Sequence, residues 1–172
     1  MCRRFLLVFV MVAILAALSP ISFARMPEGM SLQKSSAPTH KALVGSWLET
    51  VAFPPETGRP MLKSLVSFHD DETMVCSDQG AVTTEPPTVF TSCHGAWTRL
   101  ENGTFAYTSL ELISDLSGNL VGYLKVRGTY IVAQSGNEYS GTSFAEVRDT
   151  DGNVLFSIDV TNAGQRIQIE RL

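Results

Sequence analysis

The chain has 172 residues with 13 Lys or Arg and 17 Asp or Glu, which gives a formal net charge of −4. An acidic chain without a basic cluster has no electrostatic reason to bind nucleic acid or anionic lipid, so we exclude these partners. The length fits one domain with a sizeable core.

Residues 1–24 have the pattern of a signal peptide. Arg3 and Arg4 form a basic start, residues 5–18 are an apolar run, and Ser22-Phe23-Ala24 places small residues where a signal peptidase cleaves. The run is shorter than the ~20 residues that span a bilayer, which argues against a transmembrane anchor. We therefore expect an exported protein, periplasmic or extracellular, that makes no membrane contact after cleavage.

The rest of the chain divides into a leader and one β domain. Residues 25–43 contain Pro, Ser, Gly and Met without periodicity and predict a flexible leader. Residues 44–172 contain no helical stretch. Polar turn clusters punctuate them at short intervals, for example Glu101-Asn102-Gly103, Ser117-Gly118-Asn119 and Asp151-Gly152-Asn153. This spacing is typical of an all-β sandwich or barrel built from adjacent antiparallel hairpins.

The turns delimit about nine strands, of which one or two can be halves of a single bent strand. The expected strands are residues 44–53, 62–68, 73–77, 94–100, 104–113, 120–132, 138–148, 154–160 and 166–171.

Two cysteines follow the predicted signal peptide, Cys76 and Cys93. In an oxidising compartment an isolated pair of this kind favours a disulfide. Together with His69 and His94 they lack the paired short spacings of a zinc site, so we expect no metal. The sequence also lacks a phosphate-binding glycine loop and a Gly-x-Ser-x-Gly nucleophile motif, and we expect no cofactor.

Gly45-Ser46-Trp47, at the start of the first expected strand, resembles the opening of the lipocalins and the wider calycin group. The resemblance implies an antiparallel up-and-down β-barrel of about eight or nine strands that holds a small ligand. It also implies that Trp47 closes the base of the barrel and that an arginine of the last strand, Arg166 or Arg171, packs across the indole. Other small barrels, among them allene oxide cyclase-like ones, share this pattern.

Alternation along each strand predicts which side chains face the interior. We expect the barrel to bind a small, largely apolar molecule, because aromatic and β-branched residues are dense on the predicted inward faces. The wall residues would be Trp47, Trp97, Tyr107, Val126, Tyr130, Phe144 and Phe156. Tyr123, Ile131 and Leu155 would face outward, and a contiguous apolar patch there would favour a homo-oligomer. A third interpretation is a filled barrel that acts through this outer face.

The alternative is an enzyme without a cofactor, such as an isomerase, cyclase or hydratase. Glu49, Glu111 and Glu146 fall mid-strand on the predicted inward faces. Glu146 or Glu111 would be the general acid or base, because a carboxyl group in an apolar interior has a raised pKa. Tyr107 or Tyr130 would orient a ligand oxygen. Glu146 is the preferred acid, since Phe144 on the same face suggests that this face is buried. His94 is either a base at the barrel rim or a surface histidine.

Overall fold

The computed structural model describes residues 39–79 and 87–170. The predicted signal peptide, residues 1–24, lies outside them, as do most of the leader and Arg171. In the described part of the chain, no helix is long and apolar enough to cross a membrane.

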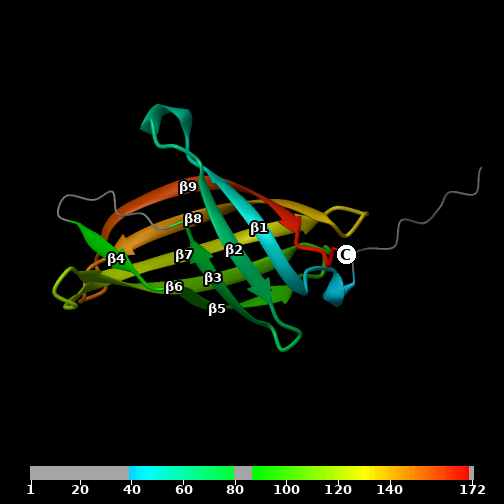
Figure 1. The fold of residues 1–172 in the computed structure, drawn as a ribbon, viewed down its shortest axis with the longest axis horizontal. Coiled ribbons are helices and arrows are strands. Elements are labelled where there is room, and N and C mark those ends of the chain that lie inside the picture. Colours follow the sequence, from blue (N-terminus) through cyan, green and yellow to red (C-terminus); the bar gives the residue numbers. More distant parts are fainter. Residues whose placement is uncertain (1–38, 80–86, 171–172) are drawn as a thin grey trace, which may run out of the picture. The chain divides into compact units, whose positions relative to one another are not determined.

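Eight antiparallel strands close into a barrel, which confirms the predicted all-β barrel class. In the order in which they neighbour one another they are β1 (Gly45–Ala52), β2 (Leu62–Phe68), β3 (Thr73–Asp78), β5 (Cys93–Arg99), β6 (Phe105–Asp115), β7 (Leu120–Val132), β8 (Glu138–Arg148) and β9 (Val154–Arg166). β9 pairs with β1 and closes the barrel. Figure 1 shows β1 and β2 crossing in front of β7 and β8.

Two elements differ from the expected strands. β4 (Thr88–Phe90) is an additional short strand that pairs with the end of β6, and a three-residue strand is too short to show alternation. β9 continues without a break through residues 161–165, which lie between two of the expected strands, and residues 167–170 of the last expected strand are not in a strand. Residues 161–165 stay extended because they pair with β1 on one side and with β8 on the other.

One end of the barrel is closed by the 3-10 helix η1 (His40–Ala42) and the residues around it. Leu43 is fully buried, so the predicted flexible leader is wrong for residues 39–43: burial of an apolar side chain holds this segment on the barrel. A second 3-10 helix, η2 (Pro55–Thr57), lies in the connection between β1 and β2.

Trp47 and Arg166 form the contact that the calycin resemblance implied. The guanidinium carbon lies 4.1 Å from the centre of the Trp47 ring, a cation–π arrangement. Arg166 also donates hydrogen bonds to the carbonyl oxygens of Ala42, Val44 and Gly136, and the Trp47 Nε1 donates to the carbonyl of Leu43 at 2.9 Å. These bonds tie the start of the domain to its last strand.

Large side chains fill the barrel next to this closed end. We call this region the floor half; its buried residues are Leu43, Trp47, Val66, Phe68, Met74, Trp97, Phe105, Tyr130, Val132 and Tyr139. Their rings contact one another edge to face or tilted, with centroids 4.4–6.5 Å apart. Such packing stabilises a core beyond the burial of area alone.

Candidate functional site

The opposite end of the barrel interior is less densely filled. Here Ile113 and Val160 are buried, but six other inward-facing aliphatic residues are only half-buried, although the sheet around them is closed; they are Val51, Leu62, Leu124, Val126, Ala145 and Ile158. Phe156, at the end of the barrel, is 44% exposed. We call this region, together with the acidic side chains described below, the open half. Part of its inner wall is accessible to water.

Three tyrosines line the boundary between the two halves, and each faces a glycine on the neighbouring strand. The pairs are Tyr107–Gly128, Tyr130–Gly141 and Tyr139–Gly164. A Cβ atom on Gly128 would lie 2.7 Å from the Tyr107 ring and one on Gly141 2.7 Å from the Tyr130 ring. Only glycine leaves room for rings that lie flat against the adjacent strand.

This arrangement stacks the rings into a continuous series. Tyr107 and Tyr130 are parallel, with centroids 4.7 Å apart and planes 5° apart. Tyr130 contacts Tyr139 at 4.4 Å, and Tyr139 contacts Trp47 at 4.8 Å. The series brings three phenol hydroxyl groups into the middle of the barrel.

Hydrogen bonds connect these hydroxyls to Glu49, which is 5% exposed. Tyr139 donates to Glu49 Oε2 at 2.8 Å. Ser143 Oγ donates to Asn162 Oδ1 at 2.6 Å, so the hydroxyl of Tyr107, 2.6 Å from Ser143 Oγ, is the donor to that serine. We call the six side chains, Glu49, Tyr107, Tyr130, Tyr139, Ser143 and Asn162, the Glu49 network.

The Glu49 network sets the ionisation of its members. Burial raises the pKa of Glu49, and hydrogen bonds from Tyr139, Tyr130 and Asn162 oppose that rise. Burial, and then the charge of Glu49, raise the pKa of Tyr107 to about 12. The pKa values of Tyr130 and Tyr139 are raised for the same two reasons. The tyrosines therefore remain protonated donors at physiological pH.

Glu111 lies on the inner face of β6, opposite Leu124 of β7, and is 6% exposed. Burial, and then the charge of Asp78, raise its pKa to about 8. The pKa of Asp78 is itself raised by desolvation and lowered by a hydrogen bond from Ser64, although much of its residue surface is accessible at the end of the barrel. Both groups belong to the open half.

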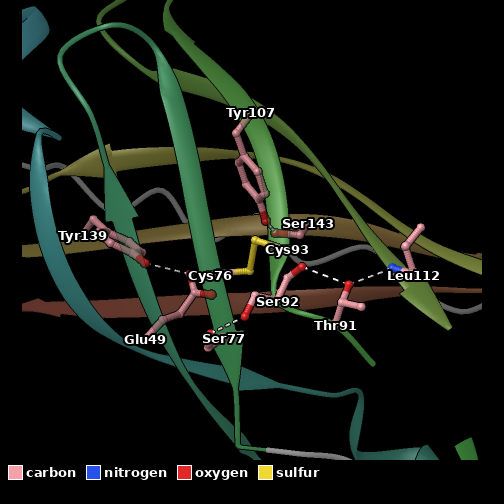
Figure 2. The surroundings of a disulfide bond; sticks show 10 residues. All are labelled: Glu49, Cys76, Ser77, Thr91, Ser92, Cys93, Tyr107, Leu112, Tyr139 and Ser143. Carbon is pink, nitrogen blue, oxygen red and sulfur yellow. Dashed lines mark hydrogen bonds between the residues drawn. A yellow bond between two sulfur atoms is a disulfide. The ribbon is translucent and has the colours of Figure 1, made fainter. Parts of the chain in front are cut away.

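The predicted disulfide between Cys76 and Cys93 is confirmed, with 4.9 Å between the Cα atoms. The two cysteines face each other across β3 and β5. Figure 2 shows this bond with the Glu49–Tyr139 and Tyr107–Ser143 pairs around it. The disulfide links β3 to β5 at the level of the candidate site.

The predicted inward orientation of Phe144 and Glu146 is wrong. Glu146 pairs with Lys125 on the outer face of the sheet and accepts hydrogen bonds from Arg127 and Arg148, both at 3.1 Å. These cations cover it, so it is only 7% exposed, and they lower its pKa. Phe144 lies under the guanidinium of Arg127 at 5.6 Å.

The alternation pattern predicted the wrong inner face for β8, because the residues of this strand that point inward are small. Gly141, Ser143 and Ala145 share the inner face, and the rings of Tyr130 and Tyr107 occupy the space beside them. Hydrophobicity alone would place Phe144 in the interior. The tyrosine rings of β6 and β7 already occupy that space, so only the face of β8 with small residues fits inside.

The other expected wall residues separate into two groups. Trp47, Trp97 and Tyr130 are at most 2% exposed and belong to the packed floor half. Tyr107, at the boundary, is 7% exposed, while Val126 and Phe156 line the open half. His94 is exposed and pairs with Leu110 on the outer face.

Five polar residues of the site were not among the expected site residues: Asp78, Ser64, Tyr139, Ser143 and Asn162. Single polar residues inside strands resemble solvent-facing positions in sequence. One signal was available: glycines at positions 128, 141 and 164 lie within long strands, where glycine marks a close approach of another group.

The sequence matches no known protein family, and comparisons with curated proteins and with solved structures also gave no significant match. The class is therefore defined by the fold: a closed, eight-stranded antiparallel barrel of calycin-like form with one additional strand. Within residues 39–79 and 87–170, no three metal-ligating side chains cluster together.

Proposed function

We propose that this protein is an exported, lipocalin-like carrier that holds a small, largely apolar molecule in the open half of its barrel. The supporting observation is the difference in packing along the interior: the floor half is filled by aromatic side chains, whereas the aliphatic wall of the open half is half-buried. Concave, mainly apolar interiors with a few polar groups are typical ligand sites. The Cys76–Cys93 disulfide is compatible with export.

Direct binding tests this proposal. N-phenyl-1-naphthylamine is neutral at pH 7 and fluoresces strongly in apolar surroundings, so it reports entry into the barrel. Tryptophan fluorescence is a weaker reporter, because Trp47 and Trp97 lie in the packed floor half. We expect saturable binding to the full-length protein, and no binding of this or other neutral lipophilic probes would contradict the proposal.

A matched pair of variants on β7 locates the probe. Val126→Trp places an indole in the open half, whereas Ile131→Trp places one on the outer face, where Ile131 is 59% exposed. Ile131 also lines an outer groove of about 500 Å³. We expect Val126→Trp to weaken probe binding at least tenfold and Ile131→Trp to leave it unchanged. The reverse result would place the ligand in the outer groove. Near-ultraviolet circular dichroism checks that both variants fold.

A second candidate function, proton transfer without a cofactor, is favoured by Glu111 alone. Its pKa of about 8 suits a general acid or base near neutral pH, whereas Glu146, the preferred acid from sequence, is held ionised by two arginines on the outer face. Deuterium exchange at the α-carbons of cyclohexanone in D₂O tests for this chemistry. A rate that is faster with the wild-type protein than with Glu111→Gln would support it, and equal rates would exclude it for this probe.

A further inference from the structure

Glu111 has no partner in the part of the chain that the structure describes. Its side chain is 6% exposed and faces the open half, yet no hydrogen bond or ion pair with a described residue satisfies its carboxyl group. Its carboxyl oxygens are not among the fully buried side-chain atoms without a hydrogen-bond partner, so they reach water in the open half. They are therefore available to pair with a ligand.

Glu49 shows what a satisfied carboxyl group looks like in the same barrel. It is as buried as Glu111, but Tyr139, Tyr130 and Asn162 donate hydrogen bonds to it. Glu49 therefore has an internal structural role, whereas the oxygens of Glu111 remain available. The contrast separates a structural acid from a candidate binding acid.

The charges around Glu111 determine which partner fits. Asp78 on β3 is the acidic neighbour whose charge acts on Glu111, and it also acts on Glu49 of β1 and on the Tyr107 phenol of β6. Lys125 and Arg127 of β7 and His94 of β5 lie on the outer face. Arg99 of β5 is on the inner face, but it is opposite Phe105, at the other end of β6 from Glu111. An anionic ligand would be repelled here, and a cation would be attracted.

The wall beside Glu111 is aliphatic. Glu111 is opposite Leu124, and Val126 lies two residues further along the inner face of β7. Val51 and Ile158 contribute similar half-buried surface from β1 and β9. A ligand here meets a carboxyl group at one point and apolar surface elsewhere.

We infer that the open half binds an amphipathic amine, whose ammonium group pairs with the Glu111 carboxylate while its apolar part contacts the aliphatic wall. This inference rests on the proposed function and specifies its ligand class. An N⁺–H···O⁻ hydrogen bond in a partly dehydrated site is stronger than a neutral one.

Binding is coupled to proton release. Because the pKa of Glu111 is about 8, its carboxyl group is mostly protonated at pH 7 when the site is empty. An arriving ammonium group stabilises the carboxylate, and the proton passes to the buffer. The affinity for ammonium should therefore increase about tenfold per pH unit below pH 8 and level off above it, as one titrating group requires.

Three probes of equal chain length test the inference by isothermal titration calorimetry at pH 8.5: decylammonium, 1-decanol and decanoate. We expect the full-length protein to bind decylammonium at least ten times more tightly than 1-decanol, and decanoate most weakly. Glu111→Gln should lower the affinity for decylammonium to that for 1-decanol and leave 1-decanol unchanged. Glu146→Gln is the matched control on the outer face and should retain the preference.

The pH dependence gives a second readout. An alkylammonium, like lysine, keeps its charge between pH 6 and 9, so a change in affinity over that range comes from the protein. We expect the increase with pH in the wild-type protein and in Glu146→Gln, and a flat profile in Glu111→Gln. Titrations in buffers of different ionisation enthalpy should detect about one proton released per ligand at pH 7.

The outcomes separate the inference from the proposed function. If 1-decanol binds and decylammonium binds no better, the carrier function stands and the amine inference is wrong. A preference for ammonium that survives Glu111→Gln also overturns the inference, because the selectivity then resides elsewhere. If none of the three probes binds, both proposals fail together.

Discussion

The two halves of the barrel interior are built from the same eight strands but differ in chemistry. In the floor half the aromatic side chains are almost fully buried, and Arg166 closes the end with three hydrogen bonds to carbonyl groups. In the open half most of the aliphatic residues are half-buried, and two acids, Glu111 and Asp78, have raised pKa values. The floor half is held by contacts within the protein, whereas the carboxyl group of Glu111 in the open half has no hydrogen-bond or ion-pair partner among the described residues.

This difference indicates that the floor half mainly stabilises the fold and that the open half is the candidate for ligand binding. Close packing and hydrogen bonds to backbone carbonyl groups stabilise the fold, whereas a partly desolvated acid lowers stability when it is ionised. Binding sites commonly carry such a cost, because a group already satisfied by the protein has nothing to offer a ligand. Truncation of a floor residue should therefore lower stability, whereas neutralisation of Glu111 should raise it where the acid would be ionised.

The largest effect is expected in the floor half. Trp47→Ala removes a fully buried indole together with its contact to Arg166, and should lower the free energy of unfolding by about 3–5 kcal/mol. Phe156→Ala at the open end, where the ring is 44% exposed, is the control and should cost much less. Urea denaturation monitors both. Equal losses of unfolding free energy in the two variants would contradict the difference in packing between the two halves.

Removal of the disulfide should have the next largest effect. The double variant Cys76→Ala/Cys93→Ala frees a loop with a sequence separation of 17, which corresponds to about 3 kcal/mol of lost stability. Urea denaturation with and without a reductant provides the measurement. The reductant should shift the wild-type protein and leave the double variant unaffected; a shift in neither would show that the bond adds no stability.

Glu111 should make stability fall with increasing pH. Its pKa is raised from the ordinary 4.5 to about 8, so its contribution is complete below about pH 4.5 and is lost as the pH rises through 8. The wild-type protein should lose about 1 kcal/mol per pH unit between pH 6 and 8, near the limit for one proton. Glu111→Gln should lack this slope and be more stable than wild type at pH 8, as measured by thermal denaturation across pH.

Glu146 should have the smallest effect, with the opposite pH dependence. Arg148 and Arg127 lower its pKa, so its stabilising contribution is present above its ordinary pKa and is lost as the pH falls through the lowered value. Glu146→Gln should reduce the melting temperature slightly at pH 7, and the difference from wild type should shrink as the pH falls below 4.5. The difference at pH 7 should shrink in high salt, since mobile ions screen exposed charges. Insensitivity to both conditions would contradict the assignment of Glu146 to the outer face.

Predictions from sequence succeeded where a local pattern carries the information. Strand boundaries follow turn residues, so β2, β7 and β8 have the expected limits. Alternation also placed Glu49, Glu111 and Val126 on the inner face, where they lie. It failed for Phe144 and Glu146, because the volume of tyrosines on other strands decides which face of β8 fits inside.

The sequence by itself determined the all-β class and the cysteine pair, and its calycin resemblance pointed to a closure of Trp47 by Arg166 or Arg171, because each depends on turn chemistry, composition or a short motif. Tertiary structure alone decided which acid is satisfied and which is not. Glu49, Glu111 and Glu146 occupy equivalent mid-strand positions in the sequence, but one receives donors from the tyrosines, one faces the open half unpaired and one lies between arginines outside. The ionisation of a carboxyl group depends on neighbours that the chain brings together only when the barrel closes.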